Sequence, residues 1–177
     1  AHTGDHSLGL SLNGGPGETA TRIVGGVQDT TPFEFPEFVS GFYRVDRWEP
    51  VATFQYLQFV VIVRGGDFGD EFALHEIRFP IAGAPRQPFE LSNARFVFLS
   101  RDAPVMNRWT YFSYPIKQAF EERWGRVPER WDSIETIFEV RYDAKTEEQS
   151  PTGAQVYFDD LYMGRQAFNP NKPADFD

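Results

Sequence analysis

Residues 133–142 read Ser-Ile-Glu-Thr-Ile-Phe-Glu-Val-Arg-Tyr, and this stretch decides the fold class. Apolar side chains recur at every second position. Because successive side chains of a strand point to opposite faces, residues two apart share one face. The alternation therefore predicts a β-strand with one buried and one more polar face. The two sets are Ile134, Thr136, Phe138, Val140 and Tyr142 on one face, and Glu135, Ile137, Glu139 and Arg141 on the other.

Similar short runs rich in Phe, Val, Ile and Tyr recur along the chain, separated by clusters of Gly, Pro, Asn and Asp. This spacing is typical of an antiparallel sandwich rather than of βαβ units. The sequence predicts an all-β fold, an antiparallel β-sandwich (jelly roll) of about nine strands. The expected strands are 7–12, 19–24, 37–44, 51–64, 72–79, 94–100, 109–114, 133–142 and 154–163.

The first of these runs is followed by a strong turn signal. Leu8, Leu10 and Leu12 alternate with small residues, and Asn-Gly-Gly-Pro-Gly occupies 13–17. Because such residues favour tight turns, we expect the first two strands to form a hairpin.

One segment has helical periodicity instead. Ile116, Ala119, Phe120 and Trp124 fall on one stripe, and Gly125 stands where a helix commonly ends. The sequence predicts one short helix over 116–124.

Composition limits the possible classes of protein. The 177 residues, 41% hydrophobic, suit one domain with a full core, which we place at 1–168, followed by a proline-bearing tail or linker at 169–177. The net charge of −9 disfavours nucleic acid as a partner. The apolar run 57–63 is too short to insert into a membrane. The absence of cysteine excludes disulfides and a thiol nucleophile.

Two adjacent carboxylates interrupt the apolar run 156–164. Asp159 and Asp160 would be costly to bury without partners, and paired acids can ligate calcium if other oxygens converge. Strict alternation would point them to opposite faces unless a bulge turns both. The alternative interpretation is that they pair with an arginine or accept backbone N–H groups at a bulge.

Three features together resemble the galactose-binding-like jelly-roll carbohydrate-binding modules: the acid pair, the Gly-Asp-His-Ser-Leu opening at 4–8, and the Trp109 strand followed by a short helix. The resemblance implies a sandwich of eight to ten strands with a structural calcium ion. It also implies that Asp159 or Asp160 and the region of Asp5 hold the ion, and that the ligand is a polysaccharide.

Sugar recognition requires flat apolar surfaces beside planar polar groups. Two clusters have this character, 43–49 and 107–111. The longest strand adds further candidates, which we expect to complete a groove floor with Arg44 and Tyr111. The alternative for each aromatic residue is packing in the core. The candidate carbohydrate-binding residues are Arg44, Trp48, Tyr56, Gln58, Asn107, Trp109 and Tyr111.

Catalysis is not expected. The motif Glu-x-Asp-x-x-Glu of jelly-roll glycosidases is absent from the sequence, and Glu135 and Glu139 suit a solvated strand face. We expect His2 and His6 to belong to a frayed terminus and His75 to be a partly buried structural residue.

The leading hypothesis is a non-catalytic polysaccharide-binding module of an extracellular bacterial protein, with a structural calcium. The chain opens with Ala-His-Thr-Gly, which suggests a removed signal peptide or a fragment. With the module hypothesis we expect an extracellular, periplasmic or cell-surface location. The alternative is a structural jelly-roll subunit of a filament, coat or capsid that assembles through its tail. A polysaccharide lyase or hydrolase is a third possibility.

Overall fold

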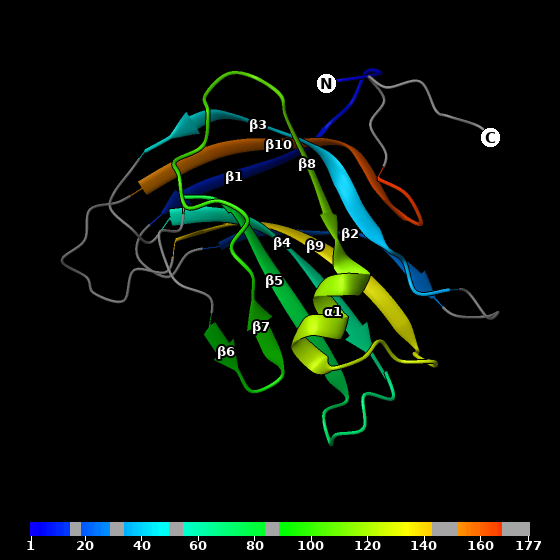
Figure 1. The fold of residues 1–177 in the computed structure, drawn as a ribbon. Helices are drawn as coiled ribbons and strands as arrows, with labels where there is room; N and C mark the ends of the chain where they lie inside the picture. The colour runs from blue at the N-terminus through cyan, green and yellow to red at the C-terminus, as the bar shows by residue number, and fades with distance from the viewer. Residues whose placement is uncertain (15–18, 29–33, 50–54, 84–88, 143–151, 168–177) are drawn as a thin grey trace.

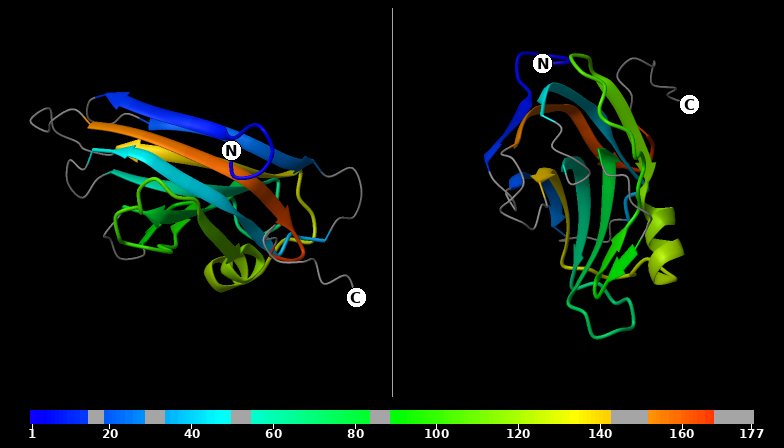
Figure 2. Two further views of the ribbon diagram at one scale, coloured as in Figure 1. Left: turned by 90° about the horizontal axis from the view of Figure 1, so that it is seen from above. Right: turned by 90° about the vertical axis from the view of Figure 1, so that its left-hand side faces the viewer.

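The computed structural model describes residues 1–14, 19–28, 34–49, 55–83, 89–142 and 152–167. Within these ranges ten strands form two stacked sheets, and one helix lies against their side (Figure 1). The right-hand view of Figure 2 shows the two layers.

The four-stranded sheet has the order β1 (Leu8–Gly14), β10 (Thr152–Gly164), β3 (Phe38–Trp48), β8 (Thr110–Pro115). The six-stranded sheet has the order β2 (Thr19–Gln28), β9 (Ser133–Tyr142), β4 (Gln55–Arg64), β5 (Leu74–Ala82), β7 (Ala94–Phe96), β6 (Phe89–Leu91).

The predicted fold class is confirmed: the chain is a largely antiparallel β-sandwich with one short helix. All paired strands run antiparallel except β5 and β7, which run parallel. The strand predicted at 133–142 has those bounds as β9, and its even-numbered residues are buried. The assignment of 169–177 as a tail falls outside the described residues, as does the first part of the strand expected at 51–64.

The helix α1 (Ile116–Trp124) also has its predicted bounds. It buries Ile116, Ala119 and Phe120, and Gly125 caps its end with φ of 80°, a left-handed conformation that glycine adopts without steric cost. The Phe120 ring packs edge-on against Phe35, with centroids 5.4 Å apart. In the part of the chain that the structure describes, no helix has the length and apolar character of a membrane span.

Aromatic rings join the two sheets. Phe59 of β4 packs on Phe112 of β8, with ring centroids 5.5 Å apart. Phe138 of β9 packs on Phe158 of β10 at 4.8 Å. All four rings are buried, so the centre of the sandwich is largely an aromatic core.

The predicted hairpin between the first two strands is wrong. β1 pairs with β10 at the edge of the four-stranded sheet, whereas β2 pairs with β9 at the edge of the six-stranded sheet. The alternating Leu10 and Leu12 share one face, which points into the core. Alternation sets the buried face of a strand but not its partner, and here the partner comes from the other end of the chain.

Candidate ligand-binding pocket

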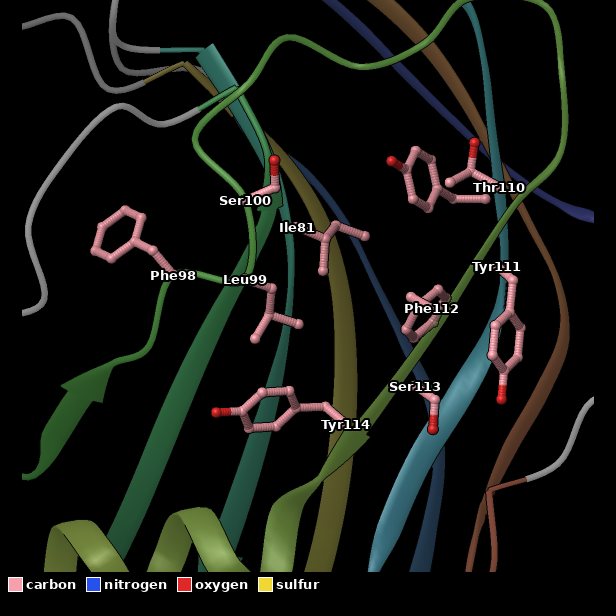
Figure 3. A pocket seen from close by; sticks show the side chains of 10 residues that line it. Ile81, Phe98, Leu99, Ser100, Thr110, Tyr111, Phe112, Ser113 and Tyr114 are labelled. Carbon is pink, nitrogen blue, oxygen red and sulfur yellow. The ribbon is translucent and has the colours of Figure 1, made fainter.

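A pocket of about 510 Å³ lies between β8 and the extended segment 98–100 (Figure 3). β8 is the outer strand of the four-stranded sheet. The facing segment runs beside β5, because Val97 and Leu99 donate backbone hydrogen bonds to the carbonyls of Arg78 and Pro80 at 2.8 and 2.9 Å. The pocket therefore lies at an open side of the sandwich, and its volume is within the roughly 300–1,000 Å³ range of small-molecule sites.

The described side chains that line this pocket carry no formal charge. Half of the ten are aromatic, and several offer hydroxyl groups. In Figure 3, Leu99 and Ile81 point towards Phe112 and Tyr114, whereas Phe98 points away. The lining residues are Tyr43, Ile81, Phe98, Leu99, Ser100, Thr110, Tyr111, Phe112, Ser113 and Tyr114.

The hydroxyl groups of this pocket are neutral hydrogen-bonding groups. Burial raises the pKa of the Tyr43 phenol, an effect that Thr110 and Arg108 partly offset. Burial, with a smaller contribution from Glu122, also raises the pKa of Tyr114. The Thr110 Oγ1 atom is shielded from solvent and has no partner of standard hydrogen-bond geometry among the described residues.

Of the seven predicted carbohydrate-binding residues, Tyr111 lines this pocket. Trp109 directly precedes β8 and is half-buried, and Asn107 is exposed, with φ of 60° and its N–H bonded to the Val45 carbonyl at 2.8 Å. Arg44 lies on the outer face of the four-stranded sheet, where its Nε donates to Asp46 at 2.5 Å. These residues lie on or beside the same sheet.

The other three candidates lie elsewhere, so the expected groove floor is not formed. Tyr56 and Gln58 belong to the outer face of the six-stranded sheet, opposite to the face that carries Arg44. Gln58 is fully buried, and its Nε2 donates to Glu139 at 2.6 Å. Trp48, at the end of β3, packs partly on the core beside Gly83.

The expectation that Glu139 lies on a solvated strand face is also wrong, because Glu139 is only 8% exposed. Besides Gln58, Arg141 donates to its carboxylate at 3.4 Å, and Arg78 lies 3.7 Å away. Glu135 has the predicted outward position and pairs with Arg64 at 2.9 Å, which lowers the pKa of Glu135.

The acid pair of β10 lies at a β-bulge. The register with β3 shifts between Asp159 and Tyr162, and Asp160 has φ of 49°. A left-handed residue inside a strand turns successive side chains away from strict alternation. Consequently both carboxylates reach the same segment, residues 1–3, which we call the N-terminal strap. The left-hand view of Figure 2 shows the N-terminal segment lying over β10.

The strap is docked, so the expectation of a frayed terminus is wrong for His2. Its backbone N–H donates to Asp159 Oδ2 at 2.6 Å, and its Nδ1 lies 2.6 Å from Asp160 Oδ2. The Thr3 hydroxyl donates to Asp160 as well. The imidazole stacks on Phe42, with centroids 3.8 Å apart. His6, in contrast, is exposed.

These contacts bear on the predicted calcium site. Asp5 is exposed, and among the described residues no three His, Asp or Glu side chains come close enough to hold an ion together. The oxygens of Asp159 and Asp160 already accept hydrogen bonds from the strap and from the Asp160 N–H. In the described structure these carboxylates contact the strap, and calcium stays a prediction.

His75 was expected to be partly buried, and it is fully buried. The ring stacks on Phe68 at 3.9 Å and meets the edge of Trp124 at 4.6 Å. Its Nε2 lies 2.9 Å from both carboxylate oxygens of Asp70, and this hydrogen bond lowers the pKa of Asp70.

Sequence reasoning missed most of the pocket. Tyr43 begins the predicted cluster 43–49, but Tyr114 is a core-type position of a strand, and Ser100 follows a strand that ends earlier than expected, at Phe96. No local pattern indicates that 98–100 lies opposite β8, because that proximity arises from the parallel pairing of β5 and β7.

A scan against known protein families finds no match for this chain, and no curated protein matches it. The two stacked sheets establish the architecture without assigning a family.

Proposed function

We propose that the protein is a non-catalytic carbohydrate-binding module of the jelly-roll type and that the pocket beside β8 binds a neutral sugar unit. The observation that carries the proposal is the lining, which combines aromatic faces and hydroxyl groups without a charged side chain. Pyranose rings present apolar C–H faces and neutral hydroxyls, and both features match such a lining.

The predicted residues near the pocket support the same ligand. Tyr111 lines it, and Trp109 and Asn107 lie on the segment that leads into β8. Aromatic and planar polar side chains in the segment next to a lining strand suit a sugar chain that continues beyond one unit. The sequence resemblance to carbohydrate-binding modules points to the same ligand class.

Two conservative variants test the proposal against a panel of neutral polysaccharides in affinity electrophoresis. Tyr114→Phe and Ser100→Ala each remove one hydroxyl from the pocket lining with little change in side-chain volume. Each is expected to weaken binding about fivefold, the equivalent of about 1 kcal/mol for one hydrogen bond.

Tyr162→Phe is the matched control, because Tyr162 is 39% exposed on β10 and does not line the pocket. This variant should bind like the wild type. Failure of the wild type to bind any polysaccharide of the panel would overturn the proposal, as would full binding by both pocket variants.

A further inference from the structure

An imidazole ring of the chain itself is held against the outer face of the four-stranded sheet. The His2 ring stacks on Phe42 with an interplanar angle of 19°, and its edge meets Trp109 at a centroid distance of 5.6 Å. The His2 side chain is only 15% exposed. A flat ring is thus enclosed by aromatic side chains from β3 and from the segment before β8.

The same residue also presents polar atoms to two carboxylates. The His2 N–H donates to Asp159, and Nδ1 faces Asp160 at 2.6 Å, while the neighbouring Thr3 hydroxyl donates to the other Asp160 oxygen. We call Phe42, Trp109, Asp159 and Asp160 the strap site. Its contacts are those that a pyranose requires, namely an aromatic face for C–H groups and carboxylates that accept bonds from adjacent hydroxyls.

The strap site and the pocket lie on opposite sides of the edge strand β8, and one residue contacts both. Tyr111 lines the pocket and packs against Phe42, with ring centroids 5.3 Å apart. A sugar chain seated in the pocket would therefore reach the strap site by crossing the sheet edge at Tyr111.

We propose that the strap site is a second sugar subsite, which takes one pyranose unit, and that residues 1–3 occupy it in competition with the glycan. This inference rests on the proposed function, because the glycan that enters the subsite is the one that the pocket binds. A ligand can enter the subsite only in those molecules in which the strap is undocked. The apparent affinity is therefore the intrinsic affinity multiplied by the fraction of molecules with an open subsite.

The test compares the glycan affinity of the full wild-type chain with that of a full-length variant in which the strap contacts are weakened. The double variant His2→Ala/Thr3→Ala removes the stacked ring and one donor, and it is expected to bind the glycan at least about threefold more tightly than the wild type. His6→Ala is the control, because His6 is exposed on the same segment, and it should bind like the wild type. His2→Ala alone is the milder variant if the double variant unfolds.

A second readout does not depend on the glycan. The peptide Ala-His-Thr-Gly, added to the double variant, should restore the strap contacts and change the fluorescence of Trp109, a change that Trp109→Phe abolishes. The same peptide should compete with the glycan for the double variant. Asp159→Asn in the double variant should weaken glycan binding, because it removes a charged acceptor.

The outcomes separate the two proposals. If the wild type binds a glycan and the double variant binds it equally or more weakly, the strap does not compete, and this inference is overturned while the function stands. If neither form binds any glycan, both proposals are overturned. Tighter binding by the double variant together with competition by the peptide supports the inference.

Discussion

Asp70 joins the loop before β5 to the buried imidazole of His75. This hydrogen bond, the largest influence on the group, lowers the pKa of the Asp70 carboxyl, so folding favours its ionised form. The stabilisation from such a group is complete above its unfolded pKa and is lost as the pH falls through the lowered folded pKa.

Asp70→Asn should therefore lower the Tm at neutral pH by no more than about 2–4 °C, because the carboxylate is partly exposed. The difference from the wild type should shrink as the pH falls below the ordinary carboxyl range. Thermal unfolding as a function of pH measures it, with Glu71→Gln, an exposed neighbour, as the control. A difference that grows in acid would contradict this assignment.

Gln58 supplies a donor to Glu139 beneath the outer surface of the six-stranded sheet. Replacing it with Leu leaves a nearly buried carboxylate with one donor fewer, which should cost about 1–3 kcal/mol of unfolding free energy. Urea denaturation measures the loss. Gln155→Leu is the comparison, because Gln155 bonds Ser11 at an exposed position, and its loss should be smaller.

Strands β3 and β10 fit together because one residue lacks a side chain. A Cβ atom on Gly41 would lie 2.7 Å from Leu161 Cδ2 and 3.2 Å from the Asp159 carbonyl oxygen. Leu161 packs on the core directly after the bulge, so Gly41 and the bulge depend on each other.

Gly41→Ala should consequently destabilise the protein by about 1–3 kcal/mol through overpacking. Gly9→Ala is the matched control on β1, because its Cβ would meet the Tyr157 ring at 3.5 Å and Gln155 Nε2 at 3.9 Å, both ordinary contacts, and its effect should stay within about 0.5 kcal/mol. Chemical denaturation of both variants tests the pair, and equal losses would refute the argument.

The bounds of the strands and the helix were more predictable than the pairing of the strands. The strand 133–142 and the helix 116–124 have their predicted bounds because each carries a strong periodic signal and, for the helix, a glycine at the stop. The partners of β1 and β2 were not predictable, since pairing depends on strands far away in the sequence.

The candidate site was predictable only in part, for a similar reason. Tyr111 could be proposed from its polar and aromatic neighbours, but the facing wall at 98–100 comes from long-range packing. Tyr56 and Gln58 were assigned to the wrong surface because alternation does not tell which sheet a strand joins. The docking of His2 follows from a bulge, which breaks the pattern used for prediction.

The two sheets share one aromatic core, so they should unfold together. Phe138 contacts Phe59 of its own sheet and both Phe112 and Phe158 of the other. Phe138→Ala should cost about 3–5 kcal/mol of stability.

Near-ultraviolet and far-ultraviolet circular dichroism should then report one coincident transition, shifted to lower urea concentration. Two separate transitions would show that the sheets unfold independently and would contradict this description of the core.

The position of β10 has a consequence for biosynthesis. It lies between β1 and β3, so the strand that completes the four-stranded sheet leaves the ribosome long after the two strands that it joins. Until then β1 has no hydrogen-bonded partner in its sheet. Its leucines Leu10 and Leu12, which are buried in the native state, belong to a core that is still incomplete. Unpaired strand edges and uncovered apolar side chains promote aggregation during synthesis. Slow translation before β10 should therefore lower the yield of soluble protein, and chaperones that shield nascent chains should restore it.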